Sequence, residues 1–183
     1  SDAMSKWEKF IHEPAPDKLI QLALLHAEFE AIHPFLDGNG RLGRMFVPLF
    51  LYQAKMIRQP IFYISAYLDK NREEYYEKLL EISKNNNWTK FCEFFLRGIQ
   101  IQAEENLQKA QDIINLYSKM KNKLLEITRS QYAIHTLDWI FAKPIFKSSD
   151  FINQGNVPKP TAQRLINLLK KEAIIKELRE AKG

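Results

Sequence analysis

Several chemically active side chains lie close together in the N-terminal quarter of the sequence. His33 can accept a proton near neutral pH. Gly38 and Gly40 let successive backbone N–H groups turn toward one point, which makes a nest for an anion. Arg41 and Arg44 are three residues apart, so both lie on one face of a helical turn beside that nest. The spacing predicts a base that faces a site for more than one phosphate.

An aspartate in the same stretch indicates a metal ion. Asp37 would repel phosphate unless a cation lay between them, and one carboxylate together with phosphate oxygens suits Mg²⁺. A helix that begins near Arg41 would add its free N–H groups and the positive end of its dipole. The stretch therefore favours transfer of a phosphate-containing group to a hydroxyl, with His33 taking the proton. Each residue alone also fits a plain turn between helices.

The apolar segments on both sides must hold this stretch in place. Asp17 is a predicted cap for a helix over 18–32, which is apolar on nearly all sides and therefore central and buried. It should end near His33, because a residue before proline avoids helical angles. The other predicted helices are 41–55 with a bend at Pro48, 72–84 after Asn71, 88–125 as one or two helices, 131–141 and 162–171.

The character of the sequence changes near residue 127, where we predict a boundary between domains 4–127 and 128–183. The second domain contains, in order, two helices, a turn at Gly155-Asn156, a helix and a strand-like segment over 173–178. This order is typical of a winged helix-turn-helix. From residue 159 onward the sequence holds seven Lys or Arg against three Glu, which fits an acidic partner or a solvated helix face.

The composition is that of an ordinary globular protein. The 183 residues are 45% apolar and 27% charged, with a net charge of +5. The single cysteine, Cys92, excludes an internal disulfide framework and fits a reducing, cytoplasmic compartment. Membrane association is not expected, because no apolar run approaches the roughly 20 residues of a bilayer span.

The stretch HPFLDGNGRLGR, His33–Arg44, resembles the Fic family signature His-Pro-Phe-x-(Asp/Glu)-Gly-Asn-Gly-Arg-x-x-Arg at every specified position. The flanking segments WEKFIHE, LALLHAEFEAI and NREEYYEKLL are similar to that family too. The segment PTAQRLINLLKKEAIIKEL resembles the winged-helix appendage of some Fic proteins. The resemblance implies an all-α fold, a Fic-type helical bundle followed by a small winged helix-turn-helix-like domain.

The same resemblance implies a nucleotidyltransferase. Fic enzymes mostly transfer AMP from ATP to a Ser, Thr or Tyr hydroxyl of a protein and release pyrophosphate. By motif position, His33 would be the general base and Asp37 would hold Mg²⁺. The residues implied for nucleotide binding are Gly38, Asn39 and Gly40 as the anion cradle, Arg41 and Arg44 on the β- and γ-phosphates, and Tyr75 and Tyr76 near the base. We interpret His26 as structural, Gly43 as a site of close helix packing, and Phe35 and Leu36 as core residues.

Three features depart from the family pattern. The family usually carries an upstream β-hairpin flap that positions the target peptide, and this sequence begins after it, so we expect a fragment. The predicted wing also stops short at Gly183. An inhibitory motif (Ser/Thr)-x-x-x-Glu-(Gly/Asn) is not matched, since Glu105-Asn106 is preceded by Ile101.

Two alternatives to adenylyl transfer stay open. The first is a nucleotide-binding DNA regulator, in which Lys159, Arg164, Lys170 and Lys171 contact phosphates. The same C-terminal segment is equally explained as an interaction domain that packs on the catalytic helices or pairs two chains into a homo-oligomer. The second alternative keeps the cradle but moves UMP, phosphate or phosphocholine, or removes AMP.

Overall fold

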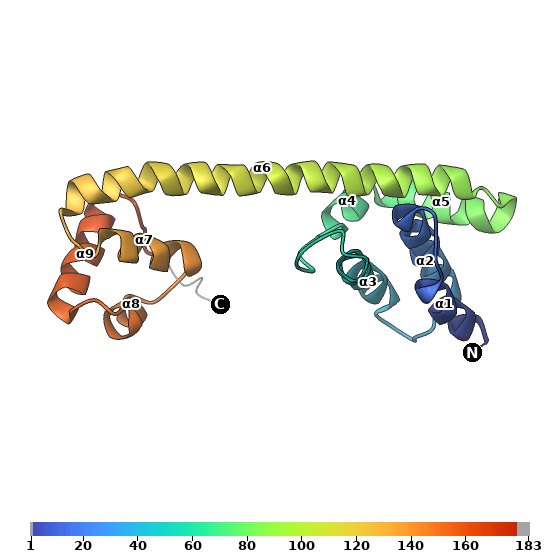
Figure 1. Cartoon of the computed structure of the whole chain (residues 1–183), viewed down its shortest axis with the longest axis horizontal. Coiled ribbons are helices and arrows are strands. Elements are labelled where there is room, and N and C mark those ends of the chain that lie inside the picture. Colours follow the sequence, from blue (N-terminus) through green and yellow to red (C-terminus); the bar gives the residue numbers. More distant parts are fainter. Residues whose placement is uncertain (1, 179–183) are drawn as a thin grey trace. The chain divides into compact units, whose positions relative to one another are not determined.

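The computed structural model describes residues 2–178. Within them the chain is helical and contains no strand, which confirms the predicted all-α class (Figure 1). No helix among these residues combines the length and the apolar character that crossing a membrane requires. The helices are α1 (Asp2–His12), α2 (Lys18–Ile32), α3 (Asn39–Gln53), α4 (Ser65–Lys70), α5 (Arg72–Asn85), α6 (Trp88–Thr128), α7 (Ala133–Ala142), α8 (Ser148–Gln154) and α9 (Lys159–Lys171).

Contacts divide the chain into two compact units, Ser1–Gln108 and Lys109–Gly183. The boundary predicted near residue 127 coincides with the end of α6 at Thr128. The division by contacts falls earlier, because Tyr117, Met120 and Leu124 of α6 pack with α7 and α9 in the second unit. Each unit has a hydrophobic core of its own.

Helix α2 is the centre of the first unit, as its sequence predicts. The Asp17 side chain caps it by accepting hydrogen bonds from the N–H groups of Leu19 and Ile20 at 2.7 and 3.1 Å. Leu22 and Leu25 are fully buried, and α2 packs on both α1 and α3. The Trp7 indole of α1 donates to the carbonyl of Leu25 at 2.8 Å. This packing holds α2, and with it the loop that begins at His33, against α1 and α3.

Helix α3 begins two residues before the predicted start. Gly38 takes a left-handed conformation, with φ +83°, and is the N-cap residue, so Asn39 and Gly40 already belong to the helix. Pro48 lies inside α3 as predicted. The shift places the signature glycines in the first turn of the helix, where free backbone N–H groups gather.

The helices predicted over 72–84 and 88–125 are both present, whereas α1 and α4 were not among the predicted helices. α5 begins at Arg72, directly after Asn71, and Asn86 ends it in a left-handed conformation. A single 41-residue helix, α6, replaces the predicted one or two helices. Gly98 lets it approach α4, because a Cβ there would lie 2.4 Å from the Tyr67 ring.

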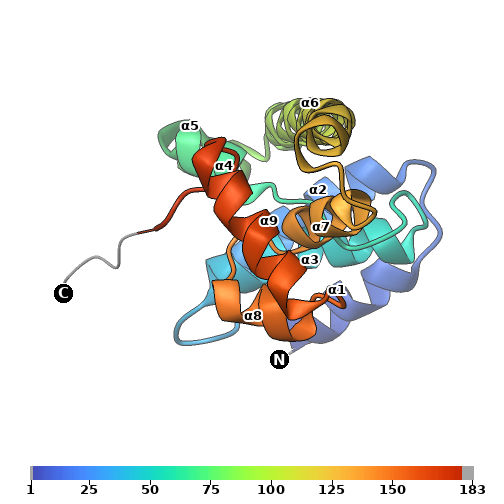
Figure 2. The same ribbon diagram turned by 90° about the vertical axis from the view of Figure 1, so that its left-hand side faces the viewer.

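In the second unit, α8 and α9 are joined by a short turn, and α7 precedes them (Figure 2). The strand predicted over 173–178 is wrong, since these described residues form no strand. A strand requires a pairing partner, and none is present among residues 2–178. Ala173 instead adopts φ +54°, and the Ile174 N–H donates to the Leu169 carbonyl at 2.9 Å, which ends α9. The rest of the predicted wing lies outside the described residues.

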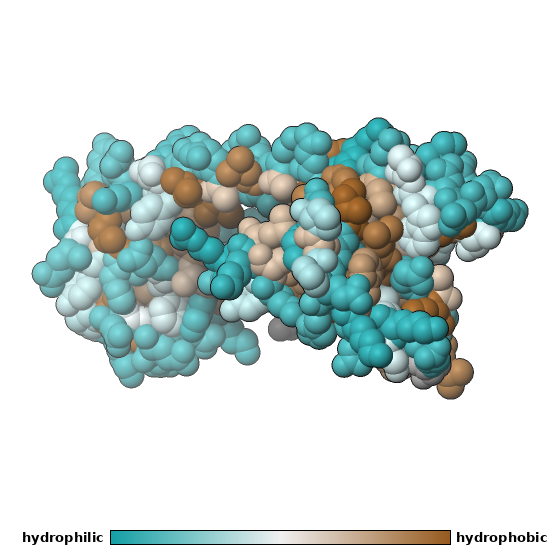
Figure 3. All heavy atoms as spheres, turned by 45° about the vertical axis from the view of Figure 1, so that its right-hand side comes forward, coloured by the Kyte–Doolittle hydropathy of each residue, from teal (hydrophilic) through white to brown (hydrophobic). Residues whose placement is uncertain are grey.

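Hydrophobic side chains reach the surface in separate groups among hydrophilic ones (Figure 3). Phe35 and Leu36, which the sequence assigned to the core, are among them, at 52% and 108% exposure. That assignment is wrong, because both residues lie in the loop between α2 and α3 and not in a packed helix.

Candidate active site

The loop between α2 and α3 carries the predicted base at its first position. His33 is the C-cap of α2, with φ +47° and ψ +58°, and its N–H donates to the Phe29 carbonyl at 3.1 Å. A non-glycine residue seldom adopts these angles, and the proline that follows disfavours the right-handed helical alternative. The imidazole is exposed, so a substrate in solution can reach it.

Asn39 fastens this loop with its side chain. Its amide oxygen accepts from the Phe35 N–H at 2.9 Å, and its amide nitrogen donates to the Phe35 carbonyl at 2.6 Å. Asn39 is 2% exposed. Its side chain therefore does not line an anion cradle, because both ends of the amide are already paired in the interior. What Asn39 offers an anion is its backbone at the start of α3.

Asp37 lies at the outer edge of the loop. Its Oδ1 accepts from the Gly38 N–H at 2.6 Å, and its Oδ2 lies 3.7 Å from the Arg41 guanidinium. The Asp37 side chain is 95% exposed. At this exposure the pair with Arg41 contributes little to stability, and both groups are accessible to a ligand.

The two signature arginines lie over the two glycines. A Cβ on Gly38 would be 3.4 Å from a guanidinium nitrogen of Arg41, and one on Gly40 would be 3.2 Å from Nη1 of Arg44. Two guanidiniums thus lie beside the N-terminus of α3, as the spacing predicts. With the free N–H groups of the first turn, they form a surface that suits a polyphosphate.

Glu30 is a residue of this site that the sequence interpretation missed. A Cβ on Gly43 would lie 2.5 Å from Oε1 of Glu30, and one on Gly40 would lie 4.0 Å from it. The carboxylate therefore lies over the first turns of α3. Burial raises the pKa of Glu30, while the charges of Arg44 and His33 act in the opposite direction. A signal was present, since Glu30 precedes His33 by three residues and so shares its side of α2.

We expect Glu30→Gln to raise the melting temperature at pH 7.5, by at most about 4 °C. Because the folded-state pKa of Glu30 is raised, the folded protein binds this proton more tightly than the unfolded chain does. The wild-type protein therefore gains stability from this group as the pH falls through that pKa, and the advantage of the variant should shrink. Thermal unfolding followed by circular dichroism measures it, with exposed Glu28→Gln as the matched control. A lower melting temperature at pH 7.5 would mean that attraction to Arg44 outweighs burial.

Beneath the loop, His26 joins α3 to α5. Its Nδ1 lies 3.2 Å from the Gly43 carbonyl, which can only accept, so Nδ1 carries the proton. Its Nε2 then accepts from the Tyr75 hydroxyl at 2.9 Å. Burial lowers the pKa of His26 to about 4, so the ring is neutral. This fits the structural role that the sequence interpretation gave to His26.

The two tyrosines of the expected pair have different environments. Tyr75 is 6% exposed and belongs to the core, and burial, followed by the charge of Glu30, raises its pKa. It has little surface to offer a nucleotide. Tyr76 is 54% exposed and lies under the Arg72 guanidinium, 5.6 Å from the ring centroid. Only Tyr76 is placed to touch a ligand.

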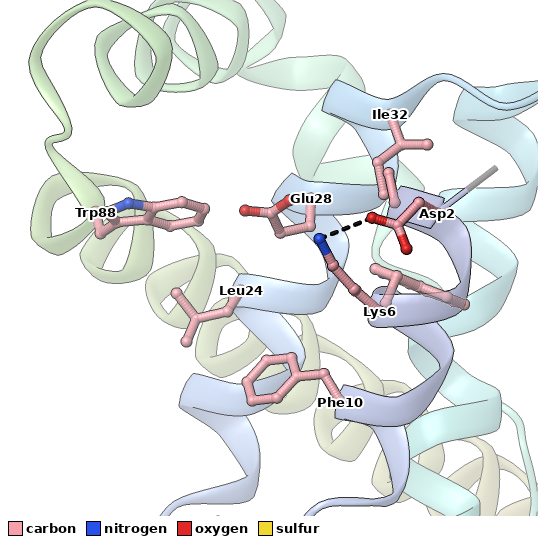
Figure 4. Close-up of a pocket in the computed structure, with 9 residues that line it drawn as sticks. Asp2, Lys6, Phe10, Leu24, Glu28, Ile32 and Trp88 are labelled. Atoms are coloured by element: carbon pink, nitrogen blue, oxygen red, sulfur yellow. Dashed lines mark ion pairs between the residues drawn. The ribbon is translucent and has the colours of Figure 1, made fainter.

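Of the cavities that α2 helps to line in the first unit, two are larger than the one at Lys18. One of about 470 Å³ lies between α2 and α5 and is lined by Glu30, Tyr76 and Leu79, among others. The other, of about 620 Å³, lies between α1 and α2 with Trp88 at its edge (Figure 4). Neither cavity is lined by a side chain of the signature stretch His33–Arg44. The smaller one is lined by Glu30, which also lies over Gly40 and Gly43, so it adjoins the first turns of α3.

The family model described as "Fic/DOC family" matches residues 1–51. The matched segment contains the complete loop from His33 to Arg44. This N-terminal part of the chain is therefore similar to the Fic/DOC family. Proteins of this family are transferases that commonly move nucleotide or other groups onto proteins.

Proposed function

We propose that this chain is a protein adenylyltransferase that moves AMP from ATP to a Ser, Thr or Tyr hydroxyl of a target protein. The observation that carries the proposal is that the Arg41 and Arg44 guanidiniums lie beside Gly38 and Gly40 at the start of α3. Asp37 lies 3.7 Å from Arg41, and His33 is the first residue of the same loop. The match of residues 1–51 to the Fic/DOC family model supports it.

In the proposed reaction His33 takes the proton of the attacking hydroxyl. The hydroxyl oxygen forms a bond to the α-phosphorus, the bond from that phosphorus to the bridging oxygen breaks, and pyrophosphate leaves with the electron pair. Arg41, Arg44 and the N–H groups of α3 bind the β- and γ-phosphates, where negative charge develops. Glu30 provides a counter-charge for Arg44 when no nucleotide is bound.

Mg²⁺ suits the side chains of this site. Asp37 offers an exposed carboxylate at the edge of the phosphate-binding surface. Within residues 2–178 no three His, Cys, Asp or Glu side chains form a metal-binding group. Mg²⁺ is commonly held by one or two carboxylates and substrate phosphates without such a group. When bound, the ion would neutralise phosphate charge next to Asp37.

The cavity between α2 and α5 supports a place for the nucleoside. It has about 470 Å³ of free volume and a mixed lining that includes the exposed ring of Tyr76 and the apolar side chain of Leu79. Ligand sites of this size commonly combine apolar walls with a few polar groups. Glu30 connects this cavity with the phosphate-binding surface at Gly40 and Gly43.

Labelled ATP tests the proposal. The chain is incubated with Mg²⁺ and a cell lysate, once with ATP labelled at the α-phosphate and once at the γ-phosphate. We expect protein-bound label from the α position alone, and mass spectrometry should find one adenylate on a hydroxyl residue. Label from the γ position alone would make the chain a phosphotransferase. No label in either case, together with UTP or a phosphocholine donor giving a product, would replace AMP with that group.

A further inference from the structure

The second unit carries a polar helix face that the proposed transfer reaction does not use. The exposed side chains of α9 include Lys159, Gln163, Arg164, Asn167 and Lys171. Positions 160, 163, 164, 167 and 171 recur at helical spacing and so share one face. The opposite face is anchored in the core through Ala162, Leu165, Ile166 and Leu169, each at most 1% exposed. The face is therefore presented on a rigid support.

The turn before α9 is fixed as well. A Cβ on Gly155 would lie 2.4 Å from the Phe151 carbonyl oxygen, so only glycine fits there. The His135 side chain of α7 bonds to the Gly155 carbonyl through Nε2, and Val157 is buried in the core. Asn156 adopts φ +51° between them. Helix α8, this turn and helix α9 thus form a helix-turn-helix whose turn has a fixed conformation.

The chemistry of the α9 face favours nucleic acid over a protein partner. Protein interfaces have a core of large apolar and aromatic side chains, and within α9, all of which is described, no large hydrophobic side chain is exposed. Over residues 129–178 the sequence has eight Lys or Arg against four Asp or Glu, which suits a polyanion. Arg, Gln and Asn are the side chains that most often read base edges.

The shape of the element then selects duplex DNA. An α-helix enters the major groove of B-form DNA, whereas the major groove of A-form RNA is too narrow for side chains to read. The Gln163 amide donates to Asn167 Oδ1 at 3.2 Å, which still leaves exposed Asn167 its Nδ2 donors and one lone pair on Oδ1, the groups with which asparagine pairs with adenine. We propose that α9 is a recognition helix that binds duplex DNA in the major groove, with Arg164 and Asn167 reading bases and Lys159 and Lys171 on phosphates.

One residue expected among the phosphate contacts is excluded from this set. The ammonium group of Lys170 forms a 2.6 Å ion pair with Glu177, beyond the end of α9. Its position is also off the exposed face, since Leu169 and Ile166 next to it are buried. The proposed DNA-binding surface therefore includes fewer basic side chains than the sequence of α9 suggests.

Binding of the full chain to a randomised pool of DNA duplexes of about 20 bp, roughly two helical turns, tests the inference. After selection, the enriched duplex is labelled with fluorescein and titrated by anisotropy. We expect Arg164→Ala and Asn167→Ala each to weaken binding about tenfold. Lys159→Ala should reduce the slope of log affinity against log salt concentration by about one. Exposed Lys121→Ala on α6, which removes the same charge away from α9, should change affinity less than about twofold.

Other results would overturn the inference. One is failure of the chain to bind at about 50 mM salt, and another is a selected pool that contains no enriched sequence. Equal binding to the matching RNA duplex would also contradict it, as would equal losses of affinity for Arg164→Ala and Lys121→Ala. Circular dichroism of each variant checks that the helices are intact. The experiment is independent of transferase activity, so a failure here leaves the proposed reaction untouched.

Discussion

His33→Ala is expected to lower the rate of AMP transfer by about 10²- to 10⁴-fold, the usual contribution of a general base. The physical reason is that His33 is the only imidazole in the loop between α2 and α3, and the Asp37 carboxylate there is already engaged with the Gly38 N–H and Arg41. Affinity for ATP should hardly change, because the phosphates are held at the N-terminus of α3. Incorporation of α-labelled adenylate measures the rate, and calorimetric titration with ATP measures binding.

A second variant separates chemistry from conformation. His33 has φ +47°, which alanine tolerates poorly, whereas asparagine adopts such angles more readily. His33→Asn should therefore fold as well as the wild type and still lose transfer. His12→Ala, a histidine at the end of α1, is the matched control and should keep the wild-type rate. Transfer by the asparagine variant at more than about a tenth of the wild-type rate would remove His33 from the mechanism.

The sequence predicted those elements whose signals are local. The cap at Asp17 and the end of α2 before Pro34 follow from side-chain and steric effects within a few residues, and both are confirmed. Likewise, the base, the acid and the two arginines lie within one short stretch of sequence, so chain connectivity alone brings them together. Fold class and the surroundings of His33 were predictable for this reason.

Features that depend on contacts across helices were not predictable in the same way. Nothing in the sequence near Asn39 says that its amide turns inward to Phe35, because a loop asparagine serves equally well as a cap or a ligand. The Ile174-Ile175 pair is typical of a strand, but it follows a helix end and finds no strand to pair with among the described residues. The position of Glu30 in the site depends on the close packing of α3 against α2 at Gly43, which the sequence alone does not give.

Gly43 links the surface chemistry to the interior. One side of it faces the Glu30 carboxylate, and its carbonyl accepts from His26, which in turn accepts from Tyr75. The helix that carries Arg44 is therefore attached to α2 and α5 through a buried, neutral imidazole. Because a protonated ring could not accept from Tyr75, the attachment depends on the protonation state of His26.

Acid should accordingly destabilise the first unit as the pH falls below 6.5. The pKa of His26 falls from 6.5 in the unfolded chain to about 4 in the fold, so the unfolded chain binds the additional proton between these values. The contribution to stability is complete above pH 6.5 and is lost as the pH falls toward 4. At about 1.4 kcal/mol per pH unit, the loss reaches about 3 kcal/mol.

Chemical unfolding at a series of pH values, compared between the wild type and His26→Gln, measures this loss. The carboxylates are common to both proteins, so the difference in slope between pH 6.5 and 4 belongs to His26. Should the glutamine variant fail to fold, the proton resonances of the His26 ring in the wild type give a second measure. They should show no titration above about pH 5, because burial and the nearby charge of Arg44 keep the ring neutral. A midpoint near 6.5 for His26 would mean that its ring reaches water, and the attachment of α3 through Gly43 would then have to be explained by packing alone.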